Sequence, residues 1–108
     1  MVKKTLSQVQ QEIDEWAGQF AEPYFPPLSR MACMTEEVGE VARVINRMYG
    51  SKKNKDDESI KDLEEELVDL LFTLVCMANS ENINLTQSYE RKMDKVIKRD
   101  NNRWEKRV

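Results

Sequence analysis

Two short acidic motifs carry the side chains of this sequence that could do chemistry. The first is a Glu-Glu-Val-Gly-Glu run that contains Glu37 and Glu40, and the second is a Glu-Leu-Val-Asp run from Glu66 to Asp69. Residues three positions apart share one face of an α-helix, so each motif would present a pair of carboxylates. If the two helices pack together, the pairs converge on an all-oxygen site, which suits hard divalent ions such as Mg²⁺ or Mn²⁺.

Acidic pairs at this spacing also occur on many solvated helices, because Glu and Lys are both good helix formers. Here both pairs border apolar stripes, where neighbouring acids repel each other and a bound cation would relieve the repulsion. Surface charge stays open as the alternative explanation. The absence of histidine argues against zinc and against the Glu-x-x-His motif of di-iron bundles. Cys33 and Cys76 are expected to be buried free thiols.

Helices must position these acids, and the spacing of apolar residues predicts four of them. Their expected spans are about 6–20, from Pro27 or Leu28 to about Tyr49, from an N-cap at Ser59 to about 79–80, and from a cap at Asn84 or Thr86 to about Asn101. Thr5 to Gln8 has the form of a capping box. Residues 22–27 would form a proline-stiffened aromatic loop, Gly50 would end the second helix, and residues 51–58 would form an exposed, mobile connector.

Apolar stripes run along the second and third predicted helices. They consist of Met31, Met34, Val38, Val41, Ile45 and Met48 on the second helix, and of Ile60, Leu63, Leu67, Leu70, Leu71, Leu74 and Ala78 on the third. The acidic pairs are expected beside these stripes, at the boundary between core and solvent. Residues 70–78 are apolar almost all round the helix, so we expect a second subunit to cover the face that one chain leaves open.

Length and composition are typical of a single helical domain. All 108 residues fit one domain, 1–108, and Gly and Pro are scarce, so we expect an all-α protein, a four-helix bundle completed by oligomerisation. The net charge of −3, with both signs interspersed, argues against binding of duplex nucleic acid. No apolar run approaches the roughly 20 residues that span a bilayer, and no secretion signal is visible, so we expect a cytoplasmic protein without a membrane partner.

Two further groups of side chains could contact a ligand. Tyr24 and Phe25 lie on the proline-stiffened loop and could stack on a base, whereas Trp16 continues the core stripe of the first helix. The stretch from Arg91 to Arg107 is locally basic. It is a candidate contact for an anionic ligand or, alternatively, a solvated face.

The ordered set of motifs resembles the MazG nucleotide pyrophosphohydrolase family, one of the all-α NTP pyrophosphatases. The matching segments are Trp16, Tyr24-Phe25, the acidic run 36–40, the run 65–72, Ala78-Asn79, Ile83-Asn84-Leu85, Lys95, Arg99-Asp100 and Arg103-Trp104. Each acidic motif alone is weak, but the ordered set is fairly specific and covers nearly the whole chain. It is most similar to the small YpjD-like bacterial branch of the family.

The resemblance implies Mg²⁺-dependent hydrolysis of a nucleoside triphosphate, ribo or deoxy, to the monophosphate and pyrophosphate, a reaction that could remove noncanonical or excess nucleotides. By the family pattern the metal ligands would be Glu37, Glu40, Glu66 and Asp69, and the catalytic acids would be Glu36 and Glu37. Magnesium held there would bridge the phosphates and activate water for attack at the α-phosphorus.

The resemblance also implies which residues contact the substrate and that the protein is a homo-oligomer. Lys95, Arg99 and Arg103 match the terminal family pattern and are the candidates for phosphate contacts. Family members are dimers or pairs of dimers, which implies a homodimer or homotetramer. The competing hypothesis is a non-catalytic helical dimerisation or interaction module, in which the acids are surface charge or ion-pair partners.

Overall fold

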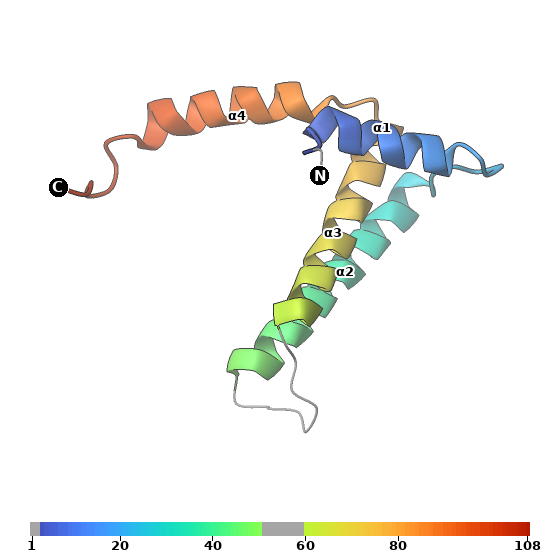
Figure 1. Ribbon diagram of the computed structural model, residues 1–108, viewed down its shortest axis with the longest axis horizontal. Coiled ribbons are helices and arrows are strands. Elements are labelled where there is room, and N and C mark those ends of the chain that lie inside the picture. Colours follow the sequence, from blue (N-terminus) through green and yellow to red (C-terminus); the bar gives the residue numbers. More distant parts are fainter. Residues whose placement is uncertain (1–2, 51–59) are drawn as a thin grey trace.

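The structure is a computed structural model that describes residues 3–50 and 60–108. Its helices are α1 (Leu6–Ala17), α2 (Pro27–Tyr49), α3 (Ile60–Ser80) and α4 (Leu85–Asp100). These described residues contain no strand, so the prediction of an all-α protein is confirmed (Figure 1). None of their helices has the length and hydropathy that crossing a bilayer requires. The predicted connector at 51–58 and the predicted N-cap at Ser59 lie outside the described residues.

The centre of the fold is a pair of helices, α2 and α3, which lie side by side and run in opposite directions (Figure 1). Arg30 Nη2 lies 3.6 Å from Glu81 Oε2 at one end of the pair, and Arg43 Nη2 lies 4.0 Å from Glu66 Oε1 farther along it. Helix α1 packs against the end of α3 near Glu81. Helix α4 packs against α1 and then runs away from the pair (Figure 1).

Local sequence sets most of the helix ends as predicted. Thr5 and Gln8 form both hydrogen bonds of a capping box at the start of α1. The Asn84 side chain caps α4 by accepting a hydrogen bond from the backbone N–H of Gln87 at 3.1 Å. Helix α2 begins at its predicted proline and is capped at its end by Gly50, whose amide donates back into the last turn.

The end of α1 was predicted wrongly, because the helix stops at Ala17 and not at Phe20. After Gly18, the amides of Gln19 and Phe20 donate to the carbonyls three residues earlier, at 3.4 and 3.1 Å, so the chain tightens into a turn. Phe20 still packs edge to face on Trp16, with ring centroids 5.1 Å apart. The apolar spacing therefore identified a real contact but overestimated the helix.

The buried sides of α2 and α3 are rotated from the predicted stripes. On α2 the buried residues are Arg30 and Val44, which the stripe did not include, whereas Val38 is 51% exposed. On α3 the buried residues are Val75, which the stripe did not include, and Ala78, which it did, whereas Leu67 is 48% exposed. The apolar arc of each helix is wider than the surface that one partner helix covers. Glu37 and Glu66 are half-buried and Asp69 and Glu40 are exposed, so the acidic pairs lie at the boundary between core and solvent, as predicted.

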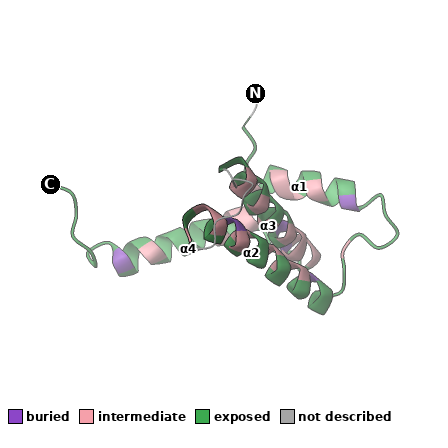
Figure 2. Ribbon diagram, turned by 90° about the horizontal axis from the view of Figure 1, so that it is seen from below, coloured by how far each residue is buried: buried purple, intermediate pink, exposed green. Residues whose placement is uncertain are grey.

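Large apolar side chains stay uncovered in the single chain. Leu71, Phe72 and Leu74 of α3 are each about 40% exposed, and Figure 2 shows how much of every helix is exposed. The radius of gyration is 17.5 Å, compared with about 13 Å for a compact chain of this length. One chain alone therefore does not close a bundle. This openness is what the predicted second subunit would cover, and the oligomeric state stays a prediction.

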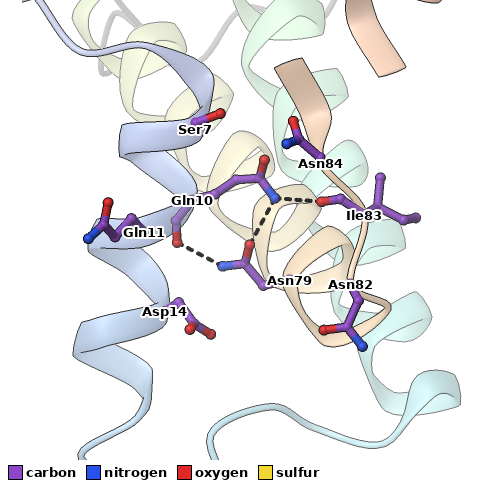
Figure 3. Close-up of a pocket in the computed structure, with 8 residues that line it drawn as sticks. All are labelled: Ser7, Gln10, Gln11, Asp14, Asn79, Asn82, Ile83 and Asn84. Atoms are coloured by element: carbon purple, nitrogen blue, oxygen red, sulfur yellow. Dashed lines mark hydrogen bonds between the residues drawn. The ribbon is translucent and has the colours of Figure 1, made fainter. Parts of the chain in front are cut away.

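A network of amide hydrogen bonds fixes the corner where α3 passes into α4 (Figure 3). Gln10 of α1 donates from Nε2 to Asn79 Oδ1 at 3.0 Å and to Ile83 O at 2.8 Å. Its Oε1 accepts from the Leu85 amide at 2.9 Å, and Asn79 Nδ2 donates back to Gln10 O at 3.0 Å. Asn82 makes the sharp bend with a φ of 56°, a left-handed conformation that Asn tolerates. One side chain of α1 therefore holds the end of α3 and the first residue of α4.

We expect Gln10→Ala to lower the free energy of unfolding by about 1–2 kcal/mol, because several partly buried groups lose their partner. Gln11→Ala is the matched control, since the Gln11 amide donates to Glu15, an exposed residue of the same helix. Denaturant unfolding followed by circular dichroism would measure both variants. Equal losses for the two variants would show that the corner network does not stabilise the fold.

Candidate active site

Three carboxylates converge between α2 and α3. Glu37 of α2 and Glu66 and Asp69 of α3 each place a carboxylate oxygen within 4.8 Å of the other two. Glu37 and Glu66 are half-buried, and Asp69 is exposed. Helical spacing puts Glu66 and Asp69 on neighbouring positions of one turn, and the packing of α2 on α3 brings Glu37 against them. The structure thus unites three of the four predicted acids.

Most of the electrostatic influences on Glu66 from residues 3–50 and 60–108 disfavour its charged form. Desolvation raises the pKa of the Glu66 carboxyl, and repulsion from Asp69, Glu40 and Glu37 raises it further. The positive charge of Arg43 lowers the pKa of Glu66, but this is the smallest of these effects. Three hard oxygen donors with mutual repulsion are the donor set that a divalent cation such as Mg²⁺ or Mn²⁺ fits.

The remaining two predicted acids lie beside the cluster. Glu40 is exposed and accepts a hydrogen bond from Arg43 Nε at 3.1 Å, although it is close enough to raise the pKa of Glu66. Arg43 therefore stands between Glu40 and Glu66. Glu36 is exposed and is not part of the convergent group. The roles of Glu40 as a ligand and of Glu36 as a catalytic acid stay predictions.

An apolar pocket of about 400 Å³ opens next to the carboxylates. Its walls are Trp16, Ala17, Phe20, Glu22, Pro23, Tyr24, Phe25, Arg30, Cys33, Phe72, Thr73 and Cys76. Cys33 precedes Glu37 by four residues on α2, and Thr73 follows Asp69 by four residues on α3. On both helices the pocket therefore lies one turn from the cluster, about 6 Å along the axis. A ligand with an apolar, planar part and an anionic part could occupy both.

The predicted aromatic residues line this pocket in different ways. Phe25 is largely exposed at the wall and is free to stack on a ligand. The Tyr24 hydroxyl donates to Asp14 Oδ1 at 2.6 Å and accepts from Asn79 Nδ2 at 3.1 Å. Burial, and then the bond to the Asp14 carboxylate, raise the pKa of Tyr24 to about 12. Trp16 packs edge to face on Phe72 of α3, but it is 54% exposed and lines the pocket, so its predicted place in the core is wrong for the single chain.

Arg30 is the residue at this site that sequence reasoning missed. Its side chain is only 8% exposed, and its Nε donates to Phe25 O at 2.8 Å, so it fixes the loop that carries the aromatic residues. A signal did exist, because Arg30 and Glu37 are seven residues apart and share one face of α2. The cysteines Cys33 and Cys76 are free, as predicted, and they are half-buried.

The predicted phosphate contacts lie outside this site in the single chain. Lys95, Arg99 and Arg103 belong to α4 and the residues that follow it, and α4 runs away from the helix pair (Figure 1). Arg99 and Arg103 both bind the Asp100 carboxylate, at 2.7 and 3.3 Å. The chain therefore keeps its acidic site and its basic helix end apart.

Known proteins share this sequence and architecture. The sequence profile of the MazG nucleotide pyrophosphohydrolase domain matches residues 25–104. YpjD of Bacillus subtilis strain 168 is 49% identical over 104 residues, which cover 96% of this chain and 94% of YpjD. The crystal structure of Bacillus subtilis YPJD matches with a TM-score of 0.81 at 49% identity, over 88% of this chain and 97% of that one.

A second solved structure supports the same assignment. The crystal structure of the Bacillus-conserved MazG protein, a nucleotide pyrophosphohydrolase, matches with a TM-score of 0.79 at 45% identity. The match covers 95% of this chain and 100% of that chain. The profile match spans α2, α3 and α4, and so includes the three convergent acids and the predicted phosphate contacts. The chain therefore belongs to the MazG nucleotide pyrophosphohydrolase family, a family of hydrolases.

Proposed function

We propose that this protein hydrolyses a nucleoside triphosphate to the monophosphate and pyrophosphate with Mg²⁺, for which Mn²⁺ could substitute. The observation that carries the proposal is the position of the three-carboxylate cluster one helical turn from an apolar pocket. Family membership supports the pyrophosphohydrolase reaction. Glu37, Glu66 and Asp69 would hold the cation, and Glu40 would join them once its carboxylate leaves Arg43.

In this proposal, the acidic residues bind the cation, and the packing of their helices positions the substrate. A divalent cation bound here supplies neutralisation of phosphate charge and a more acidic water for hydrolysis. Glu37 and Asp69 approach from opposite helices, so the α2–α3 register sets where the triphosphate binds. Glu36 adjoins the cluster on α2 and is our candidate for orienting the attacking water.

The pocket would take the nucleoside. Phe25 offers an exposed aromatic face, and Arg30 and Tyr24 stiffen the wall behind it through their hydrogen bonds. The interior is mainly apolar, so it would strip water from a base and leave the phosphates toward the carboxylates. We propose a homodimer or homotetramer, because the apolar faces of α2 and α3 are incompletely covered in one chain.

The competing function, a non-catalytic interaction module, explains the exposed apolar faces equally well. It does not explain why three acids converge between two packed helices, where the repulsion raises the pKa of Glu66. Acids that served only as surface charge would be expected on the outer, solvated faces. The carboxylate cluster therefore favours the hydrolase.

Glu66→Gln should raise the melting temperature of the metal-free protein at a pH above the folded-state pKa of Glu66. The folded-state pKa of Glu66 is raised, so its stabilising contribution exists below the unfolded-state pKa and is lost as the pH rises through the folded-state pKa. Above that range the Glu66 carboxylate is charged, and the glutamine removes the repulsion. The advantage of the variant should disappear in acid, below the ordinary glutamate pKa. Thermal melts in a chelator across pH would measure this.

Mg²⁺ should reverse that order, because a ligand that binds the folded state stabilises it. Wild type should melt at a higher temperature in millimolar Mg²⁺, and Glu66→Gln should respond far less. Glu64→Gln, an exposed acid on the same helix, is the matched control and should respond as wild type does. A wild type whose melting temperature ignores Mg²⁺ and Mn²⁺ would contradict a metal site at the cluster.

Wild-type protein should release pyrophosphate from at least one member of a panel of NTPs and dNTPs in Mg²⁺. Glu37→Gln should lower kcat/KM at least about 100-fold, since the charge that anchors the reacting phosphates is lost. Glu64→Gln should keep wild-type activity. If wild type releases pyrophosphate no faster than Glu37→Gln does, the proposed reaction is wrong.

Phe25→Ala should raise KM for the best nucleotide about tenfold while kcat changes little, because base stacking contributes about 1–3 kcal/mol. The substitution keeps the Phe25 carbonyl that holds Arg30. Inorganic triphosphate, which has no base, should inhibit wild type and variant equally. If the variant also binds triphosphate less tightly, Phe25 acts on the phosphate site and the pocket is not the nucleoside site.

A further inference from the structure

Arg30 carries a nearly buried charge whose hydrogen-bonding capacity the protein does not use up. Its side chain is 8% exposed, and its Nε donates to Phe25 O at 2.8 Å. Its ion-pair partner is Glu81, whose Oε2 lies 3.6 Å from Arg30 Nη2, farther than a hydrogen bond reaches, and whose side chain is 55% exposed. Within residues 3–50 and 60–108, therefore, the N–H donors of Nη1 and Nη2 make no hydrogen bond.

The space beside these donors is the apolar pocket. Among the described residues, every fully enclosed side-chain nitrogen or oxygen has a hydrogen bond, so the Nη groups of Arg30 are not sealed in protein. Arg30 lines the pocket of about 400 Å³, whose interior is mainly apolar. A charged group there loses much of its hydration and gains little in return. A ligand with acceptor atoms at this wall would supply the missing partners.

The other polar groups of the pocket wall are already engaged or are open to water. The Tyr24 hydroxyl both donates and accepts a hydrogen bond within the protein. The Thr73 hydroxyl donates to carbonyls of its own helix, at 2.8 and 3.1 Å. Glu22 is exposed, so water competes for its carboxylate. Among these wall residues, Arg30 is the buried one with donors left for a ligand.

Arg30 lies where a base would bind, at a distance from the carboxylates. Arg30 and Glu37 are seven residues apart on one face of α2, which is about 10 Å along the helix axis. If the triphosphate binds at the carboxylates, as proposed above, a nucleoside spans the distance between them and Arg30. The guanidinium then meets the edge of the base, while the exposed ring of Phe25 can stack on its face.

A guanidinium discriminates among bases by the hydrogen-bond pattern of their edges. A 6-oxopurine, such as guanine or hypoxanthine, offers two neighbouring acceptors, O6 and N7, which one guanidinium can bond together. Adenine and cytosine present an amino group in place of the keto oxygen, so donors would face donors. Uracil and thymine offer the keto oxygen O4 without a neighbouring ring acceptor. The donors of Arg30 therefore favour a 6-oxopurine.

We propose that Arg30 selects the base, and that the pocket takes a 6-oxopurine nucleotide whose O6 and N7 accept hydrogen bonds from its guanidinium. This inference rests on the proposed function, which places a nucleoside in the pocket. The burial of Arg30 makes the selection strong, because a base without these acceptors leaves the charge desolvated and unpaired. The bond from Nε to Phe25 O holds the planar group in place before the ligand arrives.

Binding of uncleavable analogues tests this selection independently of hydrolysis. The probes are the α,β-methylene triphosphates of guanosine, inosine, adenosine and 7-deazaguanosine, titrated calorimetrically in Mg²⁺. Wild type should bind the guanosine and inosine analogues at least about tenfold more tightly than the adenosine analogue, as a bidentate contact to a purine predicts. The 7-deaza analogue, in which a C–H replaces N7, should lose most of that advantage. A guanosine analogue bound no more tightly than the adenosine or 7-deaza analogue would overturn the proposal.

Arg30→Met removes the guanidinium and keeps an unbranched apolar side chain. The variant should bind all four analogues with similar affinity, whereas inorganic triphosphate should bind to variant and wild type equally. Arg91→Met is the matched control, because it removes an exposed arginine of α4 that bonds Ser88, and it should keep the wild-type preference. If Arg30→Met instead loses affinity for triphosphate as much as for the guanosine analogue, Arg30 does not select the base.

A second variant protects the test against misfolding, since Arg30 also holds the aromatic loop. Circular dichroism would show whether Arg30→Met is folded. If it is not, Arg30→Lys replaces it, because lysine keeps the charge but lacks the planar fork, and the 7-deaza analogue should then bind as tightly as the guanosine analogue.

Hydrolysis assays separate this inference from the proposed function. A wild type that prefers the guanosine analogue but releases pyrophosphate from no nucleotide would reject the proposed reaction and support the selection of the base by Arg30. Pyrophosphate release from guanine and adenine nucleotides at equal kcat/KM, with equal affinity for their analogues, would support the reaction and overturn the selection.

Discussion

Mutual repulsion among three carboxylates between two packed helices is the constraint on which the rest of this structure depends. Glu37 and Glu66 are half-buried and Asp69 is exposed, and the α2–α3 interface brings their oxygens within 4.8 Å of one another. The raised pKa of Glu66 records the cost, which comes from desolvation first and from its acidic neighbours second. A chain that maintains such an arrangement gives up stability at the place where a cation would recover it.

The same helix pair also builds the pocket, so one packing register serves two purposes. Cys33 and Thr73 line the pocket one turn from Glu37 and Asp69. A slip of α2 against α3 would displace the pocket walls and the carboxylates together. Arg30 reinforces the register, because it is buried at the pocket, bonds the aromatic loop and pairs with Glu81 beyond the end of α3.

The openness of the single chain follows from this use of the interface. Glu37 and Glu66 take up part of the surface between the two helices, and Val38 and Leu67 of the apolar arcs are about half exposed. Helix α4 does not cover them, because the Gln10 network directs it away (Figure 3). The apolar surface of the helix pair therefore stays uncovered in the single chain.

The sequence by itself determined the helices and their caps. Hydrophobic spacing, the Thr5–Gln8 capping box, the Asn84 cap and Gly50 are local features, and local hydrogen bonding and backbone freedom are enough to place them. The same spacing paired Glu66 with Asp69 on one helix, and the order of the motifs indicated the family. Among the helix ends that the structure describes, the end of α1 was misplaced, because apolar spacing continued past Gly18 while the hydrogen-bonded helix did not.

Tertiary structure alone decided which faces are buried and which charges meet. An apolar arc wider than one partner helix has several ways to pack, so periodicity could not choose the rotation that buries Arg30 and Val44 and brings Glu37 between the helices. Nor could it show that Glu40 bonds Arg43, or that α4 leaves the pair, since a few side-chain hydrogen bonds from α1 fix that direction. Periodicity specifies position around one helix axis, whereas a site between helices depends on how two axes are placed.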